Sequence, residues 1–208
     1  MFKWGSIINS METSNPPTTI EQQLELESYY YGFIGHMLGK KRNDVVDEYL
    51  ERAEKLNTKI LKASPKNPAA HSFKGSFLGF HIGLNRFKSV YLGPESKFFI
   101  NKAVNLDPNN ITALILKGNM LFYAPGMFGG DKEDALELYL KAEKLIEKSN
   151  DTDYNWEYLN LLTTLGRAYE HLNRWKDAKL MYEKALQKEP NYHFVKDELY
   201  PRLLNRMR

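Results

Sequence analysis

The stretch that decides the fold is Leu162–Pro190, LTTLGRAYEHLNRWKDAKLMYEKALQKEP. Its small residues Gly166 and Ala178 predict two helices that cross closely, because only small side chains allow such an approach. Tyr169 and Tyr182 are expected to fill the space beside that crossing. The stretch therefore predicts a pair of packed helices.

The end of this pair and its repetition follow from the same residues. Ala185 continues the small-residue spacing of the second helix, and Pro190 ends that helix because proline has no N–H to continue the ladder. One helix pair cannot bury its apolar face alone, so further copies are expected. Looser copies are present at Gly118, Leu121, Ala135, Tyr139 and Ala142, and at Gly75, Leu78, Ser96, Ile100, Ala103 and Pro108. The weakest copy carries Val46, Leu50 and Ala53.

With these residues the chain resembles the tetratricopeptide repeat family over about 170 residues. The resemblance implies an all-α fold, a superhelix of helix–turn–helix repeats that ends in a capping helix. The predicted segments are a short helix in 1–14, a degenerate first repeat in 15–66, a second repeat in 67–109, a third in 110–153, a fourth in 154–190 and a capping helix in 191–208 with a kink at Pro201. All of them are expected to form one domain.

Two insertions interrupt the repeat period. In 86–94, Gly93 and Pro94 are expected to prevent an unbroken helix. In 124–130 the glycine-rich segment leads to Asp131, which is expected to cap the next helix. Phe128 to Asp131, followed by Ala135, resembles insertions in exported bacterial repeat proteins, in the periplasmic T-component of TRAP-type transporters and in the microtubule-dynamics regulator family.

Composition excludes several classes of function. A net charge of +3 with interleaved acidic and basic residues argues against nucleic-acid binding. The chain has no cysteine, and its histidines form no zinc motif, so neither a metal nor a cofactor is expected. No apolar run of about 18 residues is present, so no membrane span is expected. An amphipathic N-terminal helix without a continuous apolar segment favours an exported, periplasmic protein with its signal removed over a cytoplasmic one.

The family resemblance also implies a binding face, because set positions of each first helix line the concave surface of tetratricopeptide proteins. Carried over to this sequence, they are Tyr29, Phe33, Ser76, Phe80, Ile115, Asn119, Phe122, Tyr123, Arg167 and His171. This lining is small and aromatic in its N-terminal part and polar toward its C-terminal end. The alternative is that the aromatic side chains pack against the insertions and the N-terminal helix.

Two functions remain open from the sequence. The first is a non-catalytic scaffold that binds a protein or peptide partner, in a bacterium and at the cell envelope. The second is a carrier for a small apolar ligand, held in a closed cavity lined by Phe33, Phe80 and Phe122. An enzyme is not expected, because no nucleophile–base pair can be named.

Overall fold

The computed structural model describes residues 2–150, 152–153 and 155–208. Over these residues the chain is helical and contains no strand, as the repeat pattern predicts. It divides into two compact units, 1–116 and 117–208, and each is described by itself. Met1 of the predicted N-terminal helix, and Asp151 and Tyr154 near the predicted start of the fourth repeat, lie outside the described residues.

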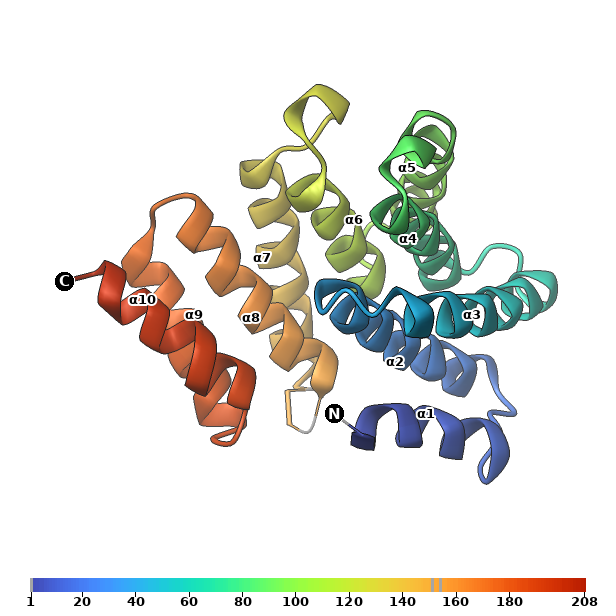
Figure 1. The fold of residues 1–208 in the computed structure, drawn as a ribbon, viewed down its shortest axis with the longest axis horizontal. Helices are drawn as coiled ribbons and strands as arrows, with labels where there is room; N and C mark the ends of the chain where they lie inside the picture. Colours follow the sequence, from blue (N-terminus) through green and yellow to red (C-terminus); the bar gives the residue numbers. More distant parts are fainter. Residues whose placement is uncertain (1, 151, 154) are drawn as a thin grey trace. The chain divides into compact units, whose positions relative to one another are not determined.

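The helices succeed one another along the chain as shown in Figure 1. The first unit contains α1 (Phe2–Thr13), α2 (Ile20–Gly39), α3 (Asn43–Ala63), α4 (Pro68–Leu84), the 3-10 turn η1 (Arg86–Lys88), α5 (Ser89–Leu106) and the start of α6 (Ile111–Tyr123). The second contains the end of α6, the 3-10 turn η2 (Gly126–Phe128), α7 (Lys132–Ser149), α8 (Trp156–His171), α9 (Trp175–Lys188), the π-helical turn η3 (Phe194–Leu199) and α10 (Tyr200–Arg206). None of the described helices is both long and apolar enough to cross a bilayer.

Helix starts are set by local polar residues. Thr19 caps α2 in a capping box, in which its side chain accepts from the Gln22 N–H while the Gln22 side chain bonds back to the cap. Asp131 accepts from the N–H groups of Glu133 and Asp134, so the predicted cap of α7 is confirmed. These bonds satisfy donors that a helix terminus leaves without intrahelical partners.

The prediction of a helix break at Gly93 and Pro94 is wrong. Helix α5 runs from Ser89 to Leu106 with Pro94 inside it. A proline removes one backbone hydrogen bond and crowds the preceding turn, which costs about 3 kcal/mol in an ordinary helix interior. Here Pro94 lies near the start of the helix, and most of α5 lies beyond it. The chain changes direction before α5 instead, at η1.

The repeat register is visible at three glycines of the first helices. A Cβ added at Gly75 would lie 2.5 Å from Ile100 Cγ1, and one added at Gly118 would lie 2.4 Å from Tyr139 Cε1. At Gly166 the facing atom is Tyr182 Cε1, at 2.2 Å. The large residue of the second helix therefore lies directly against the glycine instead of beside the crossing. Three residues beyond Ile100, Tyr139 and Tyr182, a fully buried alanine recurs at Ala103, Ala142 and Ala185.

Buried small and aromatic positions complete this register in the second unit. Ala135 and Ala178 are fully buried, and Tyr169 is 6% exposed. The phenol of Tyr182 donates to Glu170 at 2.6 Å. Ala135, Tyr169, Ala178 and Tyr182 therefore lie in the packed core. Pro190 follows the end of α9 and is exposed.

The first repeat is built differently, because it has no glycine at such a crossing. Its core includes Val46 and Leu50 of α3, and helix α1 covers part of it. Arg52 of α3 pairs with Glu12 of α1, which also accepts from the phenol of Tyr30. This ion pair and hydrogen bond attach α1 to the helix pair, so the N-terminal helix replaces part of the missing repeat contacts.

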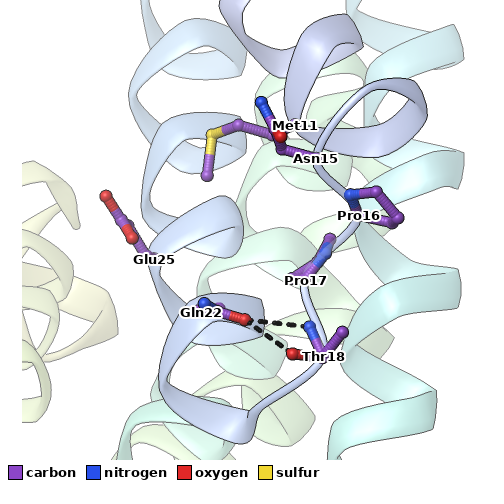
Figure 2. A pocket seen from close by; sticks show the side chains of 7 residues that line it. All are labelled: Met11, Asn15, Pro16, Pro17, Thr18, Gln22 and Glu25. Carbon is purple, nitrogen blue, oxygen red and sulfur yellow. Dashed lines mark hydrogen bonds between the residues drawn. The ribbon is translucent and has the colours of Figure 1, made fainter.

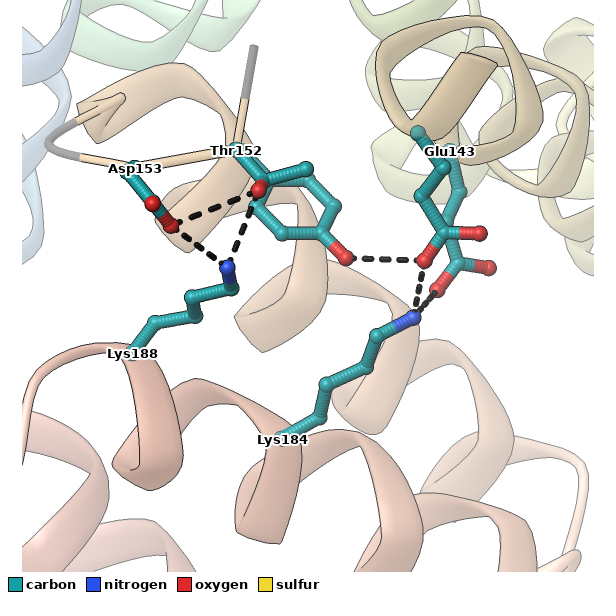
Figure 3. Close-up of polar contacts among 7 residues, drawn as sticks. Glu143, Thr152, Asp153, Lys184 and Lys188 are labelled. Atoms are coloured by element: carbon teal, nitrogen blue, oxygen red, sulfur yellow. Dashed lines mark hydrogen bonds and ion pairs between the residues drawn. The ribbon is translucent and has the colours of Figure 1, made fainter. Parts of the chain in front are cut away.

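Salt bridges join the helices of the second unit (Figure 3). Lys184 of α9 reaches Glu143 at 2.7 Å and also pairs with Glu147, both on α7. The phenol of Tyr158 on α8 donates to Glu147 at 2.9 Å, and burial raises the pKa of Tyr158 to about 12. Lys188 pairs with Asp153 at 2.7 Å, which attaches the segment before α8 to α9.

The C-terminal segment packs on this unit through residues spaced four apart. Val195, Leu199 and Leu203 are buried, whereas Phe194 is 40% exposed. The predicted kink at Pro201 is replaced by the π-helical turn η3 before it. Pro201 then lies in the first turn of α10, where no intrahelical N–H is needed.

One carboxyl of the first unit is buried without a hydrogen bond. Glu27 of α2 is fully buried, and neither carboxylate oxygen has a partner among the described residues. Burial raises the pKa of Glu27 well above its usual value, and the nearby side chain of Asn57 offsets part of this rise. The Asn57 amide itself donates to the carbonyl of Ala70 at 2.8 Å. Burial therefore favours the protonated form of Glu27 in the folded state.

Glu27→Gln is expected to make the free energy of unfolding less dependent on pH than in the wild type, because a neutral amide takes up no proton on folding. Because the folded pKa lies above the unfolded one, the wild type is stabilised below the unfolded pKa and loses this stabilisation as pH rises through the folded pKa. Urea unfolding between pH 4 and 8 tests this. The exposed Glu25→Gln on the same helix is the control. Parallel pH profiles for the wild type and Glu27→Gln would contradict the assignment.

Candidate binding surface

The residues predicted to line a binding face fall into both units. Tyr29, Phe33, Ser76, Phe80 and Ile115 lie in the first unit, and Asn119, Phe122, Tyr123, Arg167 and His171 in the second. The predicted face is therefore divided between the two units.

In the first unit two of the five predicted lining residues belong to the core. Phe33 and Ile115 are 5% and 3% exposed, so neither presents a free surface. Phe33 packs against Trp4 of α1 and against the ring of Tyr49, with ring centres 6.3 Å and 4.5 Å away. The prediction of Phe33 as an accessible contact is corrected, because the N-terminal helix covers it. Phe33 therefore packs against the N-terminal helix, which is the alternative that the sequence left open.

The remaining predicted residues of the first unit are half-buried. Phe80 stacks on Tyr31 with ring centres 5.2 Å apart, and its ring also approaches Gly35. Tyr29 and Ser76 are likewise partly covered, and burial raises the pKa of Tyr29. The aromatic side chains at this end therefore serve mainly to pack α2 against α4.

A hollow of about 350 Å³ lies elsewhere in the first unit, at the turn between α1 and α2 (Figure 2). It is lined by Met11, Asn15, Pro16, Pro17, Thr18, Gln22 and Glu25, none of which belongs to the predicted face. The Gln22 side chain accepts from the backbone and hydroxyl of Thr18, at 2.9 and 3.1 Å. These bonds belong to the cap of α2, so the hollow results from the shape of the turn between α1 and α2.

The second unit brings four of its five predicted residues into one cluster. Arg167 of α8 donates to the phenol of Tyr123 at 2.9 Å. The ring of Phe122 lies 5.0 Å from the rings of both Tyr123 and His171. Tyr123 is 59% exposed, whereas Phe122 is 4% exposed. Phe122 is therefore the buried support, and the accessible groups are the other three side chains.

Asn119 adds a further polar group on α6. Its side-chain oxygen accepts from the phenol of Tyr139 at 2.7 Å, which fixes the orientation of the amide. We define the polar face as Asn119, Tyr123, Arg167 and His171. All four side chains come from the first helices of their repeats, α6 and α8, as the family resemblance implies.

The polar face is electropositive. The pKa of His171 lies below its ordinary value, chiefly through burial and further through the charges of Lys132 and Arg167. Lys132 also lies 5.6 Å from the centre of the Phe122 ring. The nearest acidic group in sequence, Glu170, is buried and bonded to Tyr182, Arg202 and Arg206. The face can therefore donate hydrogen bonds and accommodate acidic groups.

Sequence reasoning did not assign the most exposed apolar side chains beside α6. Met127 and Phe128 in η2 are 85% and 59% exposed. The turn that presents them is tightly specified, since Gly129 has a φ of 87° and a Cβ at Gly130 would lie 1.8 Å from the carbonyl oxygen of Ala124. The paired glycines were the signal that this insertion is an ordered turn, from which the exposure of its apolar residues could have been inferred.

Comparison with known proteins agrees with this repeat geometry. Residues 160–192 match the tetratricopeptide repeat family model. A search of the curated proteins finds no match. The fold is similar to that of a thermophilic tetratricopeptide repeat protein of Thermus thermophilus, with a TM-score of 0.61 and 14% identity over 97% of this chain and 91% of that one. It is also similar to pilF of Pseudomonas aeruginosa, with a TM-score of 0.55 and 18% identity over 89% of this chain and 70% of that one.

At these identities the two structural likenesses concern the fold. The family match covers most of α8 and all of α9. The contact between Gly166 and Tyr182 in this pair recurs in the preceding repeats as Gly118 against Tyr139 and Gly75 against Ile100. Residues 160–192 thus match a tetratricopeptide repeat, and the chain has the all-α fold of tetratricopeptide repeat proteins.

Proposed function

We propose that this protein is a non-catalytic scaffold that binds a protein partner through the polar face of its second unit. The observation that carries the proposal is the exposed pair of Tyr123 and Arg167, fixed to each other across α6 and α8 by a hydrogen bond of 2.9 Å. Tyrosine and arginine are the residue types most enriched at binding hot spots. A fixed pair loses little side-chain entropy when a partner binds.

The chemistry of the surface indicates the kind of segment it would bind. Arg167 and Lys132 favour an acidic side chain or a terminal carboxylate, and the imidazole of His171 can add a hydrogen bond. Met127 and Phe128 offer an adjacent apolar contact. A peptide segment that combines an acidic group with an apolar side chain fits both parts.

A small apolar ligand is not favoured as the binding partner. The cavity expected for it required Phe33 and Phe122 to line an open space, and both side chains are buried in the cores of their own units. The remaining accessible groups of the polar face are hydrogen-bonding side chains.

The proposed setting is a bacterial cell envelope. Its support is the resemblance of the Phe128–Asp131 insertion to those of exported bacterial repeat proteins, the TRAP T-component among them. The two similar structures are also of bacterial origin. Export would place the polar face in the periplasm.

Peptides selected from a random display library on the full chain provide the test. For a selected peptide, Tyr123→Ala or Arg167→Ala should weaken binding by about 1–3 kcal/mol, since each removes one member of the fixed pair. Isothermal titration calorimetry measures the change. Lys66→Ala, an exposed change in the turn before α4, is the control and should leave the affinity unaltered.

Equal affinities of the wild type and both polar-face variants would place the binding site elsewhere. Thermal melts of the variants exclude a folding defect, and Tyr123 is exposed enough that its loss should cost little stability.

A further inference from the structure

The first unit carries a row of exposed apolar side chains, which we call the aromatic edge. It consists of Phe87 in η1 and Val90, Tyr91 and Phe98 in α5, which are 89%, 81%, 61% and 61% exposed. Residues of these types are usually buried. A contiguous exposed patch of this kind marks a surface that meets another apolar phase or molecule.

The aromatic edge lies on one side of the helix. Phe87, Tyr91 and Phe98 are separated by four and seven residues, which places them on a common face at 3.6 residues per turn. The opposite side, with Ile100 and Ala103, is buried against α4. Toward the C-terminal end the same face continues with Asn101 and Asn105, so the apolar groups gather in η1 and the first half of α5.

Basic residues outnumber acidic ones in the segment that carries this row. Residues 86–106 contain Arg86, Lys88, Lys97 and Lys102 but a single acidic residue, Glu95. A hollow of about 360 Å³ beside Phe98 is lined in part by Lys102 and by the amides of Asn101 and Asn105. An ammonium and two amide groups are donors suited to a phosphate oxygen.

We propose that the aromatic edge docks onto an anionic lipid surface, with Phe87, Val90 and Tyr91 in the interfacial region and the cations of the same segment on the headgroups. Charge complementarity supports this occupant, because basic residues beside a surface-exposed apolar face are the pattern of interfacial helices. Each Lys or Arg near an anionic bilayer adds to the attraction.

The cations of the same segment favour anionic lipid as the occupant. Phe87 and Val90 project almost fully into solvent, so both side chains are free to enter the interfacial region. Tyrosine is enriched at the headgroup level of membranes, which fits Tyr91. The aromatic edge lies in the first unit, so lipid docking is separate from the partner binding proposed for the second.

Vesicle flotation tests the proposal directly. The full chain should float with vesicles of phosphatidylglycerol and phosphatidylcholine at low ionic strength, and binding should fall when salt is added or phosphatidylcholine is used alone. The double variant Phe87→Ser, Tyr91→Ser should partition about tenfold more weakly, because it removes two interfacial aromatic side chains. The matched control is Met127→Ser, Phe128→Ser, which removes exposed apolar side chains from η2 and should float like the wild type.

A spectroscopic measurement locates the contact. The chain has no cysteine, so Val90→Cys or Met127→Cys accepts a single environment-sensitive dye. Emission should shift to the blue on anionic vesicles for the label at 90 and remain unchanged for the label at 127. The proposal is overturned by absence of flotation with anionic vesicles, by equal flotation of the wild type and the Phe87→Ser, Tyr91→Ser variant, or by an unshifted label at 90.

Discussion

Gly166→Ala is expected to lower the free energy of unfolding by about 3 kcal/mol, the upper part of the range for overpacking. The added Cβ would lie 2.2 Å from Cε1 and 2.6 Å from Cδ1 of Tyr182. That ring cannot move aside freely, because Tyr182 is fully buried and its phenol is bonded to Glu170. The helices of the fourth repeat would have to separate.

Gly79→Ala is the matched control for this substitution. Gly79 also lies inside a first helix, α4, but a Cβ built there meets no atom within 4 Å. Alanine is the better helix former, so this variant should be more stable by about 0.5–1 kcal/mol. Urea unfolding followed by circular dichroism measures both. Similar midpoints for the two variants would show that Gly166 is not at a helix crossing.

Truncation after Pro190 is expected to cost about 3–5 kcal/mol, because it removes both arginines that pair with a buried carboxylate. Glu170 accepts from Arg202 at 3.1 Å and Arg206 at 3.3 Å, and its side chain is 5% exposed. The truncation also uncovers the apolar surface against which Val195, Leu199 and Leu203 pack. The shortened chain should melt earlier and bind more hydrophobic dye.

A second variant separates charge from apolar burial. Arg202→Gln, Arg206→Gln in the full chain keeps the buried leucines and valine and removes the two ion pairs. It should lose part of the stability lost by the truncation and bind no additional dye. A truncated chain that melts with the wild type would show that the C-terminal segment contributes nothing to the second unit.

Local sequence patterns determined most of the secondary structure. Thr19 and Asp131 act as helix caps, because capping depends on groups within three residues of each other. The fourth repeat was readable for a similar reason, since a glycine and a tyrosine at fixed spacing specify one close helix contact. Pro94 shows the limit of local reading: a proline favours a helix boundary, yet α5 accommodates it.

The binding face depended on contacts between residues distant in sequence. The family resemblance places both Phe33 and Tyr123 on first helices, but Phe33 is covered by α1 and Tyr123 is exposed beside Arg167. Periodicity shows that a side chain lies on a helix face but does not show what packs against that face.

The sequence by itself determined the helical repeats, because backbone capping, helix periodicity and small-residue crossings are short-range properties. Only the tertiary structure decided which aromatic side chains remain accessible, since burial depends on segments that meet after folding, such as α1 over Phe33. It also decided that Glu27 is buried without a partner and that Phe87 and Tyr91 are exposed. Accessibility and electrostatic environment are sums over the folded neighbourhood, and local sequence carries little of that information.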